Sequence, residues 1–203
     1  SSKVLAGEVV TMSVDWEHIP AKHRSLIKAF FDEADMSADA IKTVDFPPVY
    51  GVDIVVSCEK AKDPKNGSIY LKPTQFVLGI GCRRNTAFEN IDRAIRQSLL
   101  KLQIDISDIG MIASIDVKKD EPGIKEFCER NRIDFVTYTA DELMAVQGEF
   151  SASQFVREHV GVDNVCERAA VLAGSRECNE TGELIYKKHK YDKVTVAAAK
   201  YPD

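Results

Sequence analysis

From residue 75 onward, short apolar runs alternate with amphipathic helical segments, and no other feature of the chain constrains its fold as strongly. The runs 75–80, 109–115 and 134–138 have the length and β-branched content of buried strands. Strands that alternate with helices predict a three-layer α/β/α domain whose sheet is mostly parallel or mixed. Two further runs, around Leu184 and Val194, predict an antiparallel pair at one edge of that sheet.

Capping residues predict where the helices begin and end. Three pairs have the spacing of a capping box, in which a Ser, Thr or Asn and a Glu three residues later bond each other's backbone N–H groups: Thr86 with Glu89, Thr139 with Glu142, and Asn164 with Glu167. We expect the helix opened by Thr139 to end at Gly148 and the one opened by Asn164 to end at Gly174. Two more helices are predicted, one over Pro122–Arg130 and one capped by Ser151 and Ser153 that runs to Gly161.

The first part of the chain is predicted to form a separate, smaller segment. A strand at 9–14, an amphipathic helix after Pro20, and strands at 53–57 and 69–71 give the order β-α-β-β. We therefore expect a small partial α/β domain over residues 1–74 and a larger domain over residues 75–203. Because no initiator Met precedes Ser1, we also expect a processed or truncated product.

Charge and cysteine content exclude several classes of function. The net charge is −5, from 27 Lys and Arg against 32 Asp and Glu. Neither predicted domain is basic, so we expect no nucleic-acid partner. No apolar run approaches the ~20 residues that cross a bilayer, and no leader opens the chain, so we expect a cytoplasmic protein without membrane contact. The 5 cysteines contain no CxxC pair and His18 and His23 lack the HExxH arrangement, so no metal site is expected.

Ligands of open α/β sheets bind beyond the carboxyl ends of the strands, and three loops occupy such positions. In the first, Gly79 and Gly81 suggest a dinucleotide-binding GxGxxG motif, but Arg84 stands where the third glycine would fall. Arg83 and Arg84 suit a carboxylate or phosphate better, because a guanidinium binds such anions through two hydrogen bonds. The alternative is a pair of solvated or salt-bridged surface arginines.

The second loop follows the run 109–115. Asp116 is a candidate general base there, and Lys118 and Lys119 are candidate cationic donors. The alternative is a mixed-charge loop whose acidic residues, Asp120 and Glu121, favour the start of the next helix.

The third loop spans residues 164–168. The predicted capping box already accounts for Asn164 and Glu167, so the residues alone assign no function to them. We expect Cys82 and Cys166 to be structural or ligand-lining rather than nucleophilic, since neither has a recognisable base partner.

Four ordered motifs resemble a known family. They are 77–86 (VLGIGCRRNT), 113–121 (ASIDVKKDE), 150–153 (FSAS) and 162–170 (VDNVCERAA). Together they resemble the C-terminal domain of the cobalamin-biosynthesis protein family CbiG, a domain shared with the stand-alone protein CobE. Asn85 stands where the family usually has Gly, and the turn tolerates it because Asn also adopts positive φ. Residues 1–74 resemble part of the central region that precedes this domain in CbiG, and the family's N-terminal domain is expected to be missing.

The resemblance implies a cobalt-precorrin-5A hydrolase. Such an enzyme opens a lactone formed from a ring acetate and releases acetaldehyde, which gives cobalt-precorrin-5B. The alternative is a non-catalytic corrinoid-binding or carrier module like CobE. No cofactor is implied, because the cobalt arrives within the substrate. The implied partner is a carboxylate-rich corrinoid, with other corrin-pathway enzymes or a second copy of the chain as further candidates.

The resemblance also assigns roles to residues. Asp116 would be the catalytic base, with N–H groups of the loop 81–85 as oxyanion donors. Cationic side chains would neutralise substrate carboxylates, and Gly79 and Gly81 would let the main chain approach the ring. The implied substrate-binding residues are Gly79, Gly81, Cys82, Arg83, Arg84, Thr86, Lys118, Lys119, Glu121, Ser151, Ser153, Asn164, Cys166, Glu167 and Arg168. Without the N-terminal domain, we expect the chain to bind a corrinoid but to turn over slowly.

Overall fold

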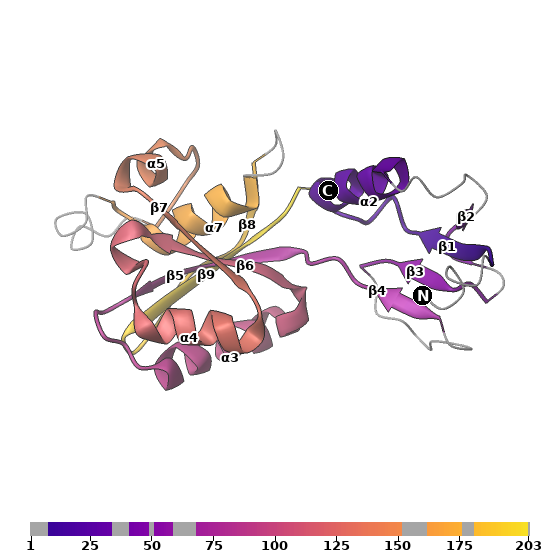
Figure 1. The fold of residues 1–203 in the computed structure, drawn as a ribbon. Helices are drawn as coiled ribbons and strands as arrows, with labels where there is room; N and C mark the ends of the chain where they lie inside the picture. Colours follow the sequence, from indigo (N-terminus) through magenta and orange to yellow (C-terminus); the bar gives the residue numbers. More distant parts are fainter. Residues whose placement is uncertain are drawn as a thin grey trace. The chain divides into compact units, whose positions relative to one another are not determined.

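The structure is a computed structural model that describes residues 8–33, 41–48, 51–58, 68–151, 162–175 and 181–202 (Figure 1). The chain divides into two compact units, one formed by residues up to Pro73 and one by Thr74–Pro202. Among the described residues, no helix combines the length and the apolar character that a membrane crossing requires.

The smaller unit is a parallel sheet with strand order β2-β1-β3-β4. Its elements are β1 (Val10–Val14), α2 (Ala21–Glu33), β2 (Ile41–Val44), β3 (Ile54–Val56) and β4 (Ile69–Leu71). The predicted order β-α-β-β was wrong by one strand, because it omitted β2. That strand has no apolar run: Lys42 and Thr43 are exposed and its two aliphatic residues are only half-buried.

The larger unit is built on a mixed sheet with strand order β7-β6-β5-β9-β8. Its strands are β5 (Phe76–Cys82), β6 (Ile109–Ile115), β7 (Asp134–Tyr138), β8 (Glu183–Tyr191) and β9 (Val194–Lys200). Strands β5, β6 and β7 run parallel, whereas β9 is antiparallel to both β5 and β8. The predicted mixed sheet with an antiparallel pair at one edge is confirmed.

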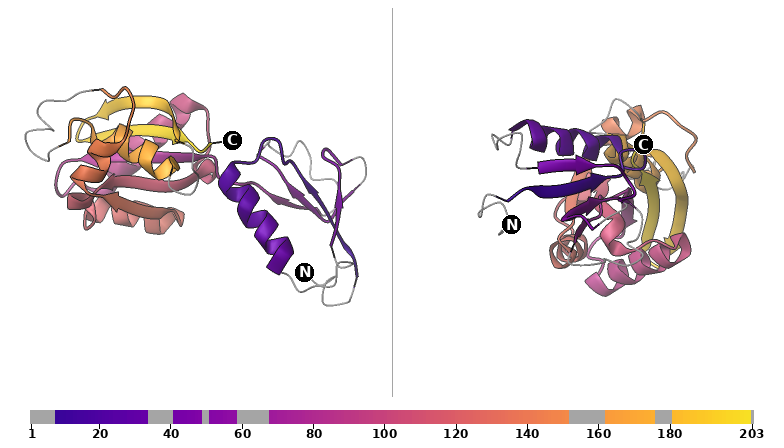
Figure 2. Two further views of the ribbon diagram at one scale, coloured as in Figure 1. Left: turned by 90° about the horizontal axis from the view of Figure 1, so that it is seen from above. Right: turned by 90° about the vertical axis from the view of Figure 1, so that its right-hand side faces the viewer.

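Helices cover both faces of this sheet, which confirms the predicted three layers (Figures 1 and 2). On one face, Leu78 and Ile80 of β5 share a core with α3 (Phe88–Leu102) and α4 (Pro122–Asn131). On the other, Val77 packs with α5 (Ala140–Ala145) and α7 (Val165–Ser175). The alternation of side chains along β5 thus divides it between the two cores.

The helix starts agree only in part with the predicted caps. The box of Thr139 and Glu142 is confirmed at the start of α5. The box of Thr86 and Glu89 is wrong: α3 starts after Ala87, and the Thr86 hydroxyl instead donates to the Arg83 carbonyl (2.7 Å). Helix α5 also ends at Ala145, before the predicted Gly148. The helix predicted to end at Gly161, the cap Ser153 and Cys178 lie outside the described residues.

Candidate functional site

A cavity of about 740 Å³ lies in the larger unit, at the carboxyl ends of β5 and β6. This is the edge of the sheet that the sequence predicted for a ligand. The start of α7 and the hairpin between β8 and β9 complete its walls. The lining residues are Gly81, Cys82, Arg83, Arg84, Ile115, Val117, Lys118, Asp163, Asn164, Val165, Cys166, Lys188, Lys190, Asp192, Lys193, Val194 and Thr195.

Helix α7 lies close enough to β5 to form this cavity because Gly79 has no side chain. A Cβ at this position would lie only 1.8 Å from the carbonyl oxygen of Cys166. Gly79 is buried under the helix and does not line the cavity. It serves the packing of α7, whereas Gly81 does face the cavity, beside the Thr195 hydroxyl.

Positive charge gathers around the cavity although the whole chain is acidic. Exposed Arg83 and Arg84 follow β5, and their position supports the prediction of an anion-binding loop. Lys188, Lys190 and Lys193 come from the β8–β9 hairpin, which the sequence reasoning treated as structure alone. The lysine-rich run 187–193 was the signal available in the sequence.

Lys118, predicted as a candidate cationic donor, lines the cavity. Its side chain is buried, and its ammonium pairs with Glu121 at 3.0 Å. The other carboxylate oxygen of Glu121 accepts the N–H of Thr86 at 2.9 Å. Glu121 and Thr86 therefore tie the start of α4 to the loop after β5, and they do not line the cavity.

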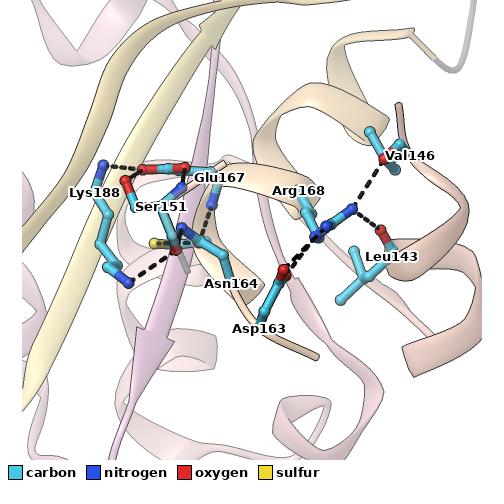
Figure 3. A network of polar contacts seen from close by, with 9 residues as sticks. Leu143, Val146, Ser151, Asp163, Asn164, Glu167, Arg168 and Lys188 are labelled. Atoms are coloured by element: carbon cyan, nitrogen blue, oxygen red, sulfur yellow. Dashed lines mark hydrogen bonds and ion pairs between the residues drawn. The ribbon is translucent and has the colours of Figure 1, made fainter. Parts of the chain in front are cut away.

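Arg168, to which the resemblance assigns a substrate carboxylate, is buried and held by contacts within its own chain. Its guanidinium donates to Asp163 at 2.7 and 3.3 Å, and to the carbonyls of Leu143 (3.2 Å) and Val146 (2.9 Å), as Figure 3 shows. It also lies over the Phe150 ring, 4.5 Å from its centroid. These contacts fix the end of α5 against α7, so Arg168 serves the fold.

Glu167 is fully buried and forms a second network beside the cavity (Figure 3). Its carboxylate accepts the N–H and hydroxyl of Ser151, both at 2.8 Å, and the N–H of Lys188 at 2.6 Å. Only half of the predicted capping box is present: the Asn164 side chain accepts the N–H of Glu167 at 3.0 Å, but the Glu167 carboxylate is engaged elsewhere. Burial alone would raise the pKa of Glu167, and these hydrogen bonds lower it below its ordinary value.

The proposed catalytic groups are not gathered at the cavity. Asp116 opens a 3₁₀ turn and does not line it, although its neighbours Ile115 and Val117 do. Exposed Lys119 also lies outside the lining. The N–H of Arg83, one predicted oxyanion donor, already donates to the Lys193 carbonyl at 3.1 Å.

The two cavity thiols are poor nucleophiles. Burial raises the pKa of Cys82 to about 11 and that of Cys166 to about 12. Cys166 donates to Asn164 at 3.5 Å. Both thiols stay protonated at neutral pH, which agrees with the expectation that neither attacks a substrate. Among the described residues, no cluster of His, Cys, Asp and Glu could hold a metal ion.

Comparison with known proteins places this geometry in a family context. The chain is 31% identical over 138 residues to a cobalt-precorrin-5A hydrolase of Priestia megaterium, a match that covers 68% of this chain and 35% of the relative. It is 37% identical over 102 residues to the cobalt-precorrin-5A hydrolase of Salmonella typhimurium, covering 50% of this chain and 29% of the relative. The chain thus spans about a third of the length of these curated relatives.

The crystal structure of CobE, a protein of the cobalamin biosynthetic pathway, shares the fold with a TM-score of 0.58 at 24% identity. The match covers 62% of this chain and 89% of CobE. Residues 76–199, which hold every wall of the cavity, match the family described as "Cobalamin synthesis G C-terminus". The chain therefore belongs to the family of the C-terminal domain of the cobalamin synthesis protein G.

Proposed function

We propose that this chain acts in cobalamin biosynthesis as the corrinoid-binding part of a cobalt-precorrin-5A hydrolase. The observation that carries the proposal is the cluster of cations around one cavity in a chain of net charge −5. Two arginines after β5 and three lysines of the β8–β9 hairpin face the same space. A corrin intermediate carries many acetate and propionate carboxylates, so it matches this charge.

The rest of the lining suits the other part of such a substrate. Apolar side chains of Ile115, Val117, Val165 and Val194 line the cavity between the cations. An apolar floor with a cationic rim fits a largely apolar macrocycle whose carboxylates project from its edge. The cobalt would enter as part of the substrate, so this reaction assigns no metal ligand to the protein.

The names of the relatives favour hydrolysis over a non-catalytic carrier role. The two carboxylates among the described lining residues, Asp163 and Asp192, are alternatives to Asp116 as the base. Hydrogen bonds from Arg168 lower the pKa of Asp163, however, and this makes it a weak base. The residues outside this chain in the longer relatives are a further source of catalytic groups.

We expect the double variant Arg83→Ala/Arg84→Ala to bind a carboxylate-rich corrinoid at least about tenfold more weakly than the unmodified chain. Removing one charge-assisted hydrogen bond costs about 1.5–3 kcal/mol when the ligand covers the guanidinium. The measurement is an equilibrium titration with cobyrinic acid at moderate salt, followed by the corrinoid absorption spectrum. The matched control is Arg93→Ala, an exposed arginine of α3 outside the cavity lining. Unchanged affinity in the double variant would remove the arginine loop from the site.

Incubation with cobalt-precorrin-5A tests the reaction itself. We expect the 203-residue chain to change the corrinoid spectrum and to release much less acetaldehyde than a full-length relative does, because positioning several groups around water and substrate contributes several kcal/mol to such a step. Acetaldehyde is measured by coupling to alcohol dehydrogenase. Turnover equal to that of the full-length relative would place the complete catalytic set within this chain.

A further inference from the structure

Strand β8 contains an extra residue beside the cavity. Tyr186 pairs with Ala198 of β9 and His189 with Val196, so three steps along β8 correspond to two along β9. Such a bulge redirects side chains and occurs frequently next to binding sites. Lys188 lies within the bulge, and its side chain lines the cavity.

Glu167 of the neighbouring helix α7 holds this bulge through a hydrogen bond to its backbone. The backbone N–H of Lys188 donates to the Glu167 carboxylate at 2.6 Å instead of joining the regular β8–β9 pairing. The same carboxylate is fixed by the N–H and hydroxyl of Ser151. Because Glu167 is fully buried on α7, the backbone at Lys188 is tied to the buried interior of the unit.

The ammonium of Lys188 is poised for an anion. Its hydrogen-bond partner is the Ser151 carbonyl, at a long 3.4 Å, and that oxygen already accepts the Asn164 amide at 2.8 Å. In the described part of the chain, no carboxylate lies within ion-pair distance of this ammonium, in contrast to Lys118, which pairs with Glu121. The Lys188 charge is among the causes that lower the pKa of the buried Glu167 carboxylate, but the two groups form no direct ion pair. An ammonium in this position on the wall of a cavity favours a negatively charged ligand group.

We propose that Lys188 binds a carboxylate of the corrinoid and that Glu167 is the positioning residue that directs Lys188 into the cavity. This inference rests on the proposed function for the identity of the ligand. The inference adds to that function a specific contact, in which the β8 bulge binds a substrate carboxylate on the wall formed by α7 and the β8–β9 hairpin. Substrates that lack this carboxylate should gain nothing from Lys188.

The test compares cobyrinic acid with its fully esterified form, which keeps the macrocycle and loses the charges. Lys188→Met, which keeps most of the length of the side chain and removes its charge, should bind the acid about tenfold more weakly and the ester with unchanged affinity. The control is Lys187→Met, a neighbouring exposed lysine of β8 outside the cavity lining. Its affinity for both ligands should stay within about twofold of that of the unmodified chain, because an exposed charge outside the cavity contributes little.

The positioning role is tested by a double-mutant cycle. Glu167→Gln should lose the same affinity for the acid as Lys188→Met, and the double variant should lose no more than either. Titrations are run at a temperature at which circular dichroism shows each variant folded. Ser151→Ala removes only the hydroxyl bond to Glu167 and provides a milder variant should Glu167→Gln fail to fold.

The outcomes separate this inference from the proposed function. Normal binding of the acid by Lys188→Met, together with weak binding by Arg83→Ala/Arg84→Ala, would overturn the inference and leave the corrinoid site intact. If the affinity losses of the two single variants add up in the double variant, or if Glu167→Gln loses equal affinity for the acid and the ester, Glu167 has a structural role alone. A wild-type chain that binds neither corrinoid would overturn both.

Discussion

We expect Gly79→Ala to destabilise the larger unit by about 3 kcal/mol or more, a large part of the 5–15 kcal/mol that stabilises a typical domain. A methyl group at this position meets the Cys166 carbonyl at 1.8 Å and the Ala170 nitrogen at 2.9 Å. Both atoms belong to the backbone of α7, so no side-chain rotation relieves the contact. The helix must move away from β5, and the core that includes Val77 and Ala169 must separate with it.

Denaturant unfolding measures this effect in each unit. Circular dichroism follows the whole chain, while Trp16, the single tryptophan, reports on the smaller unit. Gly81→Ala is the matched control on the same strand, because its new methyl group meets only the hydroxyl of Thr195, at 2.6 Å, and that side chain can rotate. We expect a loss of about 1 kcal/mol or less there. Equal losses in the two variants would contradict the assigned role of Gly79.

The architecture of the larger unit was predictable because its signals are local. The strands β5, β6 and β7 are short apolar runs, and the face of α3 that carries Ile91 and Ile95 shows helical spacing over a few turns. Strand β2 was missed for the same reason, since its four residues are partly exposed and carry no apolar alternation. Its pairing with β1 supplies the stability that its own sequence does not indicate.

Only the part of the candidate site that directly follows a strand in the sequence was predictable. Arg83 and Arg84 directly follow a strand, so a general rule about strand ends located them. The lysines of the hairpin reach the same cavity through the antiparallel pairing of Cys82 with Val194, across more than half of the chain. No local pattern encodes that contact, and the sequence predicts only an antiparallel pair of edge strands around Leu184 and Val194.

Glu167 illustrates how a local motif can mislead. Its spacing from Asn164 fits a capping box, and the Asn164 half of that box is present. Its carboxylate, however, bonds Ser151 and Lys188, which lie 16 and 21 positions away. The carboxylate half of the capping box does not form, because the carboxylate satisfies three other donors in the folded unit. Leaving those donors unpaired inside the protein would cost stability.

Arg168→Lys should destabilise the larger unit by about 2 kcal/mol even though it keeps the positive charge, and Arg168→Met should cost about 3 kcal/mol. The guanidinium bonds Asp163 through two nitrogens while it also reaches the carbonyls of Leu143 and Val146. An ammonium cannot hold this planar set or stack in the same way on Phe150. Thermal unfolding of the two variants measures the loss of stability. The matched control is Arg93→Lys, at an exposed arginine.

The pH dependence of this loss identifies its cause. The hydrogen bond from Arg168 holds the pKa of Asp163 below its usual value of 3.8. A carboxyl group with a lowered pKa stabilises the fold above its unfolded pKa, and that contribution disappears as the pH falls through its folded pKa. The stability gap between the wild-type chain and Arg168→Met should therefore be widest near neutral pH and narrow below about pH 4. A titration with cobyrinic acid separates the structural role of Arg168 from a role in binding. If Arg168 bound a substrate carboxylate, Arg168→Lys would unfold like the wild-type chain and would lose affinity for cobyrinic acid. Because the guanidinium already bonds Asp163 and two backbone carbonyls inside the unit, we expect lower stability and an unchanged affinity of the folded variant.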